Sequence, residues 1–243
     1  MLHATRALPA LTDLTPTQQA YFGYLANYEG NTRRLYEYHL SVWFQWCADQ
    51  GIDPMAAERT HLALFVRYRS EVVGNKASTI NTMFAAIKGL YAYAVIEGLI
   101  DRDPAAHVRL PKIHRERKYP LDREELRSIR KAGKKLGGRH WALAELLVVH
   151  GLRISECCSL LIEDMQDTEN GHRVMRLTRK GGKRVTIPIP VAVLIALEAA
   201  QGDRTEGPLI ATRDGRPLNR HGATGLVDTI MRHTKIERHI NPH

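Results

Sequence analysis

Cysteine is scarce in this 243-residue chain, and several familiar signals are missing. The three cysteines include an adjacent pair, Cys157 and Cys158, but no CxxC pair, so the sequence predicts reduced, structural thiols. No uninterrupted apolar run reaches the ~18 residues of a membrane span, and the amino terminus lacks a signal-peptide pattern. The histidines show no HExxH motif and no Cys/His finger spacing. We therefore expect a cytoplasmic protein without a disulfide scaffold, a membrane partner or a metal.

Charge is the most informative part of the composition. Lys and Arg number 35 against 26 Asp and Glu, which gives a formal net charge of +9 and a pI near 9.6. A basic balance of this size favours a polyanionic partner such as nucleic acid. The length allows two modest domains.

The amino-terminal part has the pattern of four helices and no strand. Thr15 and Gln18 are spaced as a capping box at a helix start. Three further helices are expected over residues 31–50, 60–73 and 78–98. The inward-facing side of the second is predicted to hold Leu35, His39, Val42, Trp43 and Trp46. We expect core or edge packing, rather than stacking on bases, for the aromatic residues Trp43, Trp46, Tyr91 and Tyr93.

Positive charge continues from these helices into the segment that follows. Candidate DNA contacts on the helices are Arg33, Arg34, Lys76 and Lys88, although a solvated face explains them equally well. Residues 108–120 contain two prolines and many cations, which predicts an extended linker. Its candidate phosphate contacts are Arg109, Lys112, Arg115, Arg117 and Lys118.

The stretch from His150 to Glu156 is where a phosphate site is predicted. An apolar helix over residues 141–149 runs into Gly151, which can adopt the left-handed conformation that ends a helix. A second helix should start at Arg153 and carry apolar residues at helical spacing, namely Ile154, Cys157, Cys158 and Leu161. Arg153 and Glu156 then share its polar side, and a guanidinium at a helix start suits bidentate phosphate binding. An ordinary Arg–Glu pair worth about 0.2–0.5 kcal/mol is the alternative.

The carboxy-terminal part changes from helical to alternating periodicity. Asp122 and Glu125 have capping-box spacing, and residues 173–190 alternate as two strands joined by a glycine-containing turn. Further helices are expected over residues 191–200 and after Asn219. The turn holds Lys180 and Lys183. A flexible lysine there can protonate an oxygen that leaves a phosphate, whereas the alternative is a plain solvated turn.

Together these segments resemble the tyrosine recombinases, the phage-type integrases. The resemblance rests on Gly-Leu-Arg-Ile-Ser-Glu at residues 151–156, on the lysine-bearing hairpin, and on the ending Ile-Asn-Pro-His at residues 240–243. It implies a mainly α fold with a small antiparallel β-sheet. A helical, SAM-like core-binding domain (residues 1–107) and a basic linker (108–120) would precede an α+β catalytic domain (121–243), incomplete at its carboxyl end.

The resemblance also implies a function and a set of roles. A tyrosine would attack a DNA phosphate, and the catalytic residues would be Arg153, Lys180, His243 and Glu156, the last as an orienting group. Lys183 would contact phosphate. No cofactor or metal is implied, and the partners would be double-stranded DNA and, on DNA, further copies in a tetramer. No tyrosine follows Tyr119, so we expect no nucleophile in this chain and no strand cleavage by it as written.

Two alternatives belong to other functional classes. One is a non-catalytic DNA-binding fragment or shortened integrase that occupies sites as a regulator. The other is a helical DNA-binding regulator unrelated to recombinases, against which the Lys180 hairpin argues.

Overall fold

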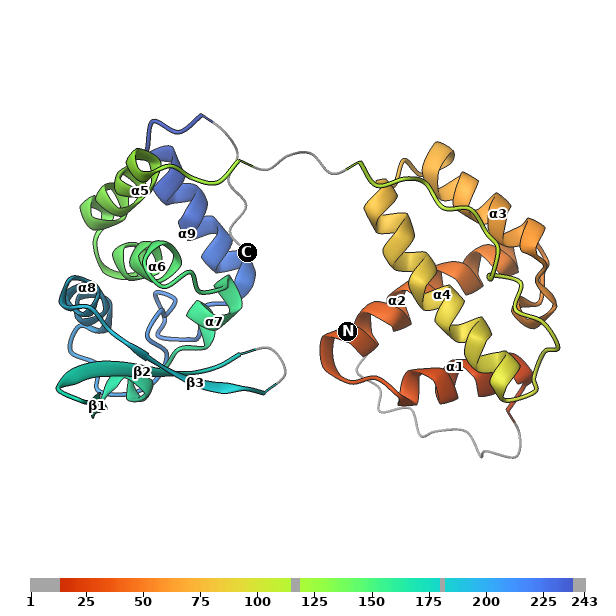
Figure 1. Ribbon diagram of the computed structural model, residues 1–243, viewed down its shortest axis with the longest axis horizontal. Coiled ribbons are helices and arrows are strands. Elements are labelled where there is room, and N and C mark those ends of the chain that lie inside the picture. Colours follow the sequence, from red (N-terminus) through yellow and green to blue (C-terminus); the bar gives the residue numbers. More distant parts are fainter. Residues whose placement is uncertain (1–13, 115–118, 180–181, 238–243) are drawn as a thin grey trace. The chain divides into compact units, whose positions relative to one another are not determined.

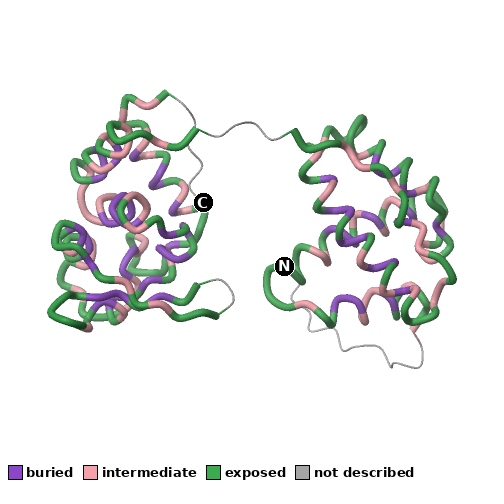
Figure 2. The backbone as a smooth tube through the Cα atoms, in the orientation of Figure 1, coloured by how far each residue is buried: buried purple, intermediate pink, exposed green. Residues whose placement is uncertain are grey.

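The computed structural model describes residues 14–114, 119–179 and 182–237. The chain divides into two compact units, Met1–Arg117 and Lys118–His243 (Figure 1). Each unit encloses buried residues that form its own hydrophobic core (Figure 2). The described elements are mainly helical with one small antiparallel sheet, which confirms the predicted fold class.

The first unit contains helices and no strand among its described residues, as predicted. The capping box at Thr15 forms, with the Gln18 amide N–H donating to the Thr15 hydroxyl and the Thr15 N–H donating to the Gln18 side chain. The predicted third helix is instead two segments, because α3 passes into a π-helical turn, η3. The elements are α1 (Pro16–Ala26), α2 (Gly30–Asp49), η2 (Pro54–Ala56), α3 (Arg59–Arg67), η3 (Tyr68–Val72) and α4 (Ala77–Ile96).

Trp43 and Tyr91 lie at the centre of this core, as predicted. Both are fully buried, the Trp43 indole N–H donates to the Tyr91 hydroxyl at 3.1 Å, and that hydroxyl donates to the Pro54 carbonyl at 2.8 Å. The prediction that Leu35 faces inward is wrong, since its exposed fraction is 42%. The inward row of α2 instead includes Leu40 and Cys47, which lie at helical spacing from Trp43.

The helix α4 is the centre of the unit and packs against α1 and α2. By length and composition it is the one described helix apolar enough to cross a membrane. Its buried side, from Ile80 to Ala94, belongs to the first core, which accounts for its apolar composition. The beginning of the predicted linker also contacts this unit, because Val108 and Leu110 pack against the core.

The second unit combines a group of packed helices with a three-stranded sheet. Its elements are α5 (Arg123–Leu136), α6 (Gly138–Val148), α7 (Ile154–Ser159), η4 (Glu163–Met165), β1 (Thr168–Glu169), β2 (His172–Thr178), β3 (Arg184–Pro188), α8 (Val191–Gln201) and α9 (Arg220–Arg232). The Asp122 capping box forms as predicted, and the helix predicted after Asn219 begins at Arg220 with Asn219 as its cap. The helix α6 packs against α5, α8 and α9, so it is the element that supports the rest of the unit.

The sheet contains the two predicted strands and one more. β2 pairs antiparallel with β3, with Leu177 opposite Val185, and β1 pairs with the other edge of β2. β1 has two residues, too few for an alternating pattern to be recognised. The prediction that Leu161 lies on the inner side of the Arg153 helix is wrong. α7 ends at Ser159, and Leu160 is buried while Leu161 is 40% exposed.

Gly133 is required where α5 and α6 cross. A Cβ at this position would lie 2.6 Å from the Ala144 Cβ and 3.2 Å from the His140 carbonyl oxygen. Gly133→Ala should therefore lower the free energy of unfolding by about 1–3 kcal/mol, as overpacking does. Urea unfolding measures it, with Gly225→Ala on α9 as the control because a Cβ there meets nothing within 4 Å. Equal midpoints for the two variants would contradict the prediction.

Candidate functional site

The junction between α6 and α7 presents Arg153 to solvent. Gly151 adopts a φ of 59°, in the left-handed region where glycine is favoured, and the chain turns there. Leu152 and Ile154 on either side are buried, 3% and 2% exposed, and anchor the turn in the core. Between them, the Arg153 side chain is 56% exposed. The predicted glycine turn is thus confirmed, and it holds a guanidinium at the surface on a fixed backbone.

Glu156 is the partner that orients Arg153. Its Oε2 accepts the Arg153 backbone N–H at 2.8 Å, and its Oε1 accepts from the Arg153 Nη1 at 2.9 Å. The Glu156 side chain is 7% exposed, so this pair is more than a solvated surface contact. The other guanidinium N–H groups make no hydrogen bond to the described residues, which leaves donors for an anion.

The pKa of Glu156 shows which interactions dominate this pair. Burial on its own would raise the pKa. The hydrogen bonds from Arg153, together with the charges of Arg153 and Arg179, outweigh burial and hold the pKa of Glu156 below its ordinary value. Glu156 is therefore a carboxylate at neutral pH, suited to hold an arginine.

Arg179 connects the hairpin electrostatically to this site. It lies at the end of β2, where its N–H donates to the Lys183 carbonyl at 2.8 Å and its carbonyl accepts from Gly182 at 3.0 Å. Its charge acts on Glu156, so the base of the hairpin lies near the Arg153 pair. Sequence reasoning did not single out Arg179. Its position beside Lys180 in the same turn was the available signal.

The neighbouring histidine is a neutral group. Burial lowers the pKa of His150, with the charge of Glu145 opposing the change. Its Nε2 is buried and has no hydrogen-bond partner among the described residues. The imidazole therefore adds no positive charge beside Arg153 at neutral pH.

Several predicted site residues lie outside the described residues: Arg115, Arg117, Lys118, Lys180 and His243. The described candidates for DNA contact are all exposed: Arg33, Arg34, Lys76, Lys88, Arg109, Lys112 and Lys183. Arg33 donates to Glu37 at 3.0 Å one helical turn away, so it already has a partner on the protein surface. Within the described ranges, no group of three His, Cys, Asp or Glu side chains is placed to hold a metal.

Glu156 should contribute stability that depends on pH. Because its pKa is lowered in the folded state, its contribution is full above the ordinary value of 4.5 and is lost as the pH falls below it. Glu156→Gln should therefore be less stable than the wild type by about 1.5 kcal/mol at pH 7. Urea unfolding at pH 7 and at about pH 3 should show this gap narrowing at the lower value. The control is Glu169→Gln at an exposed carboxylate, and a Glu156 gap independent of pH would rule out the ionic role.

Comparison with protein families matches both units. Residues 19–98 match "Phage integrase, N-terminal SAM-like domain", and residues 119–243 match "Phage integrase family". Tyrosine recombinase XerC of Mycobacterium tuberculosis (strain ATCC 25177 / H37Ra) is 32% identical over 178 residues, which cover 70% of this chain and 58% of the relative. The chain thus spans less than two thirds of that relative. XerC of Xylella fastidiosa (strain M23) is 27% identical over 88% of the chain and 73% of the relative.

Solved structures share the fold. A lambda integrase tetramer bound to a Holliday junction aligns over 99% of this chain and 74% of its own, with a TM-score of 0.71 and 16% identity. The Tn1549 transposon integrase in complex with circular intermediate DNA aligns over 90% of this chain and 78% of its own, with a TM-score of 0.67 and 18% identity.

Proposed function

Because this chain belongs to the phage integrase family, we propose that it acts in site-specific DNA recombination and holds a scissile phosphate of duplex DNA at Arg153. One observation carries the proposal. Arg153 is fixed at its backbone and through Nη1 by the buried Glu156, while its remaining donors have no protein partner among the described residues. A planar guanidinium held in this way can bind two phosphate oxygens.

The proposed chemistry is transesterification. A tyrosine hydroxyl attacks the phosphorus, the bond to the 5′ oxygen breaks, and the 3′ phosphate becomes linked to the tyrosine. Arg153 stabilises charge on the non-bridging oxygens, Lys180 protonates the leaving 5′ oxygen, and His243 assists proton transfer. Glu156 orients Arg153. The roles of Lys180 and His243 rest on their match to the family pattern.

We also propose how the rest of the chain takes part. Residues 1–107 form the core-binding domain, residues 108–120 the linker and residues 121–243 the catalytic domain. Phosphates are contacted by Arg33, Arg34, Lys76, Lys88, Arg109, Lys112, Arg115, Arg117, Lys118 and Lys183. Further copies join on DNA, in support of which a lambda integrase forms a tetramer on a Holliday junction. The protein works in the cytoplasm, where the DNA of a bacterial cell is found.

The catalytic-domain residues of this chain are proposed to lack the nucleophile, because no tyrosine follows Tyr119 among the 243 residues. A suicide substrate with a nicked core site tests this directly on a denaturing gel. The 243-residue chain should bind the substrate and give no covalent protein–DNA band, since no group is in place to form the phosphotyrosyl bond.

A covalent protein–DNA band that is present in the wild type and absent in Tyr119→Phe would identify Tyr119 as the nucleophile and contradict this proposal. Binding of the nicked substrate should weaken in Arg153→Ala, and Lys183→Ala at the hairpin is the comparison variant. An Arg153→Ala variant that binds the substrate as tightly as the wild type would contradict the role of Arg153.

A further inference from the structure

The second unit contains a hollow whose charged lining residues, among those described, are all arginines. It has a volume of about 410 Å³ and is walled by α6, the end of α8 and the loop after Ile210. Three of its lining residues are arginines, Arg139, Arg204 and Arg213, and none of the described residues that line it is a carboxylate. We call it the three-arginine hollow.

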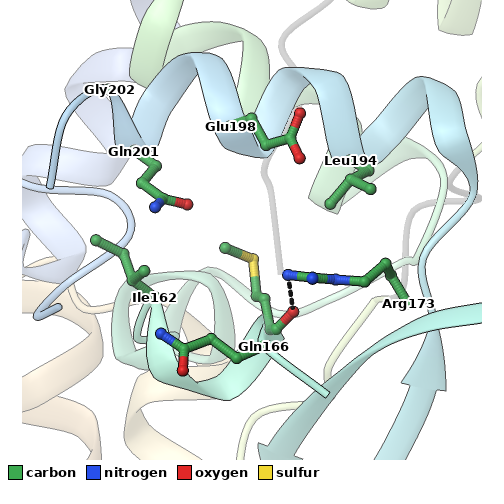
Figure 3. A pocket seen from close by; sticks show the side chains of 8 residues that line it. Ile162, Gln166, Arg173, Leu194, Glu198, Gln201 and Gly202 are labelled. Carbon is green, nitrogen blue, oxygen red and sulfur yellow. Dashed lines mark hydrogen bonds between the residues drawn. The ribbon is translucent and has the colours of Figure 1, made fainter. Parts of the chain in front are cut away.

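A second hollow in the same unit provides the contrast. It has a volume of about 240 Å³ and is lined by Arg173 and Glu198 together with two glutamines and apolar side chains (Figure 3). Its arginine donates to the Met165 carbonyl at 2.7 Å, and the Glu198 carboxylate balances the charge. That site has no preference for an anion, whereas the three-arginine hollow has the charge for one.

The three arginines have different roles. Arg204 is structural, because four of its five N–H groups donate to the carbonyls of Ala200, Gln201, Pro208 and Leu209. Arg139 donates from Nη1 to the Ala211 carbonyl at 3.2 Å and keeps its other donors. Arg213 is exposed and makes no hydrogen bond or ion pair with the described residues. Arg139 and Arg213 thus supply the free donors. Arg204 instead stabilises the backbone that lines the hollow.

The helix α6 adds a further favourable feature. Arg139 is in its first turn, where the positive end of the helix dipole favours an anion. The same helix ends at Val148, five residues before Arg153, so its two ends are separated by about 15 Å at 1.5 Å per residue. The hollow and the Arg153 site therefore lie at opposite ends of one helix and are distinct.

We propose that the three-arginine hollow is a second phosphate-binding site, independent of Arg153. Guanidinium groups bind phosphate through paired charge-assisted hydrogen bonds, and the hollow has room for one or two phosphate groups. The phosphate can come from a free phosphate compound or from a DNA backbone. Neither source requires Arg153 to hold a scissile phosphate, so this inference stands apart from the proposed function.

Calorimetric titration of the full chain with sodium pyrophosphate at constant ionic strength tests the proposal. The wild type should bind saturably, and Arg213→Ala should weaken binding about 10-fold, because it removes charge-assisted hydrogen bonds. Arg139→Lys is the second variant, since it keeps the charge but loses the paired donors, and it should also weaken binding. The matched control is Arg216→Ala, on the same loop, whose side chain is paired with Asp214 at 3.0 Å and does not line the hollow.

Repeating the titration with saturating duplex DNA separates the two sources. Pyrophosphate binding that persists identifies a free phosphate compound as the ligand, and binding that is lost identifies a DNA phosphate. Absence of saturable binding by the wild type, or equal affinities in Arg213→Ala, Arg139→Lys and Arg216→Ala, would overturn the proposal.

Discussion

Between about 50 and 200 mM salt, the affinity of this chain for duplex DNA is expected to fall by about 10³- to 10⁵-fold, as it does for six to ten phosphate contacts. The reason is that each lysine or arginine that neutralises a phosphate releases a condensed counterion. The net charge of +9 and the exposed cations of both units provide enough groups for this number of contacts. Fluorescence anisotropy across a salt series gives the slope.

Single variants make this prediction specific. Lys112→Ala should reduce the log–log slope by about 0.9, since one phosphate contact is lost. Arg153→Lys keeps its charge and should leave the slope unchanged, which makes it the matched control. A flat salt dependence for the wild type would be incompatible with phosphate-driven binding.

Arg130→Ala should lower the free energy of unfolding of the second unit by up to about 3 kcal/mol, because it leaves the buried carboxylate of Glu145 without its charged partner. The Arg130 side chain is itself 40% exposed, so solvent screening keeps the loss at the low end for an ion pair. The Arg130 Nε lies 2.9 Å from Oε2 and 3.1 Å from Oε1 of Glu145, whose side chain is 4% exposed. The Trp141 indole N–H donates to the same carboxylate at 3.3 Å. Without Arg130, a buried carboxylate on α6 loses its counter-charge.

Two comparisons test this explanation by urea unfolding. Arg127→Ala, on the same helix, breaks the exposed pair with Glu124 and should change stability by less than about 1 kcal/mol. Adding Glu145→Gln to Arg130→Ala should recover part of the loss, because a neutral amide costs less to bury than an unpaired charge. Equal losses for Arg127→Ala and Arg130→Ala would refute the explanation.

Local signals in the sequence predicted the helix boundaries well. The capping residues Thr15, Asp122 and Asn219 act within one turn of the chain, so their geometry depends on nearby residues alone. The prediction of which side of a helix faces the core was wrong for part of α2, because packing against other helices determines that side. Periodicity along α2 allowed Leu35 as a core position, but contacts with α4 turn Leu40 and Cys47 inward instead.

The sequence was enough to predict Arg153 as a site residue, but not the burial of Glu156 or the position of Arg179 beside it. Gly151 and Arg153 are two residues apart in the sequence, so a short sequence pattern was enough to recognise them. Burial of Glu156 depends on the packing around α7, and the nearness of Arg179 depends on where the hairpin lies. The burial of Glu156 and the position of Arg179 both depend on contacts between segments that are distant in the sequence. Such contacts cannot be read from local patterns in a single sequence.

The two buried cysteines make each unit measurable on its own. Cys47 and Cys157 are both fully buried, and burial raises the pKa of Cys47 to about 12 and that of Cys157 above its ordinary value. Neither thiol should react with an alkylating reagent while the core around it is folded, because alkylation requires an accessible thiolate. A time course with an alkylating reagent, followed by peptide mass spectrometry, would therefore record the opening of the first core at Cys47 and of the Arg153 helix at Cys157 in one sample.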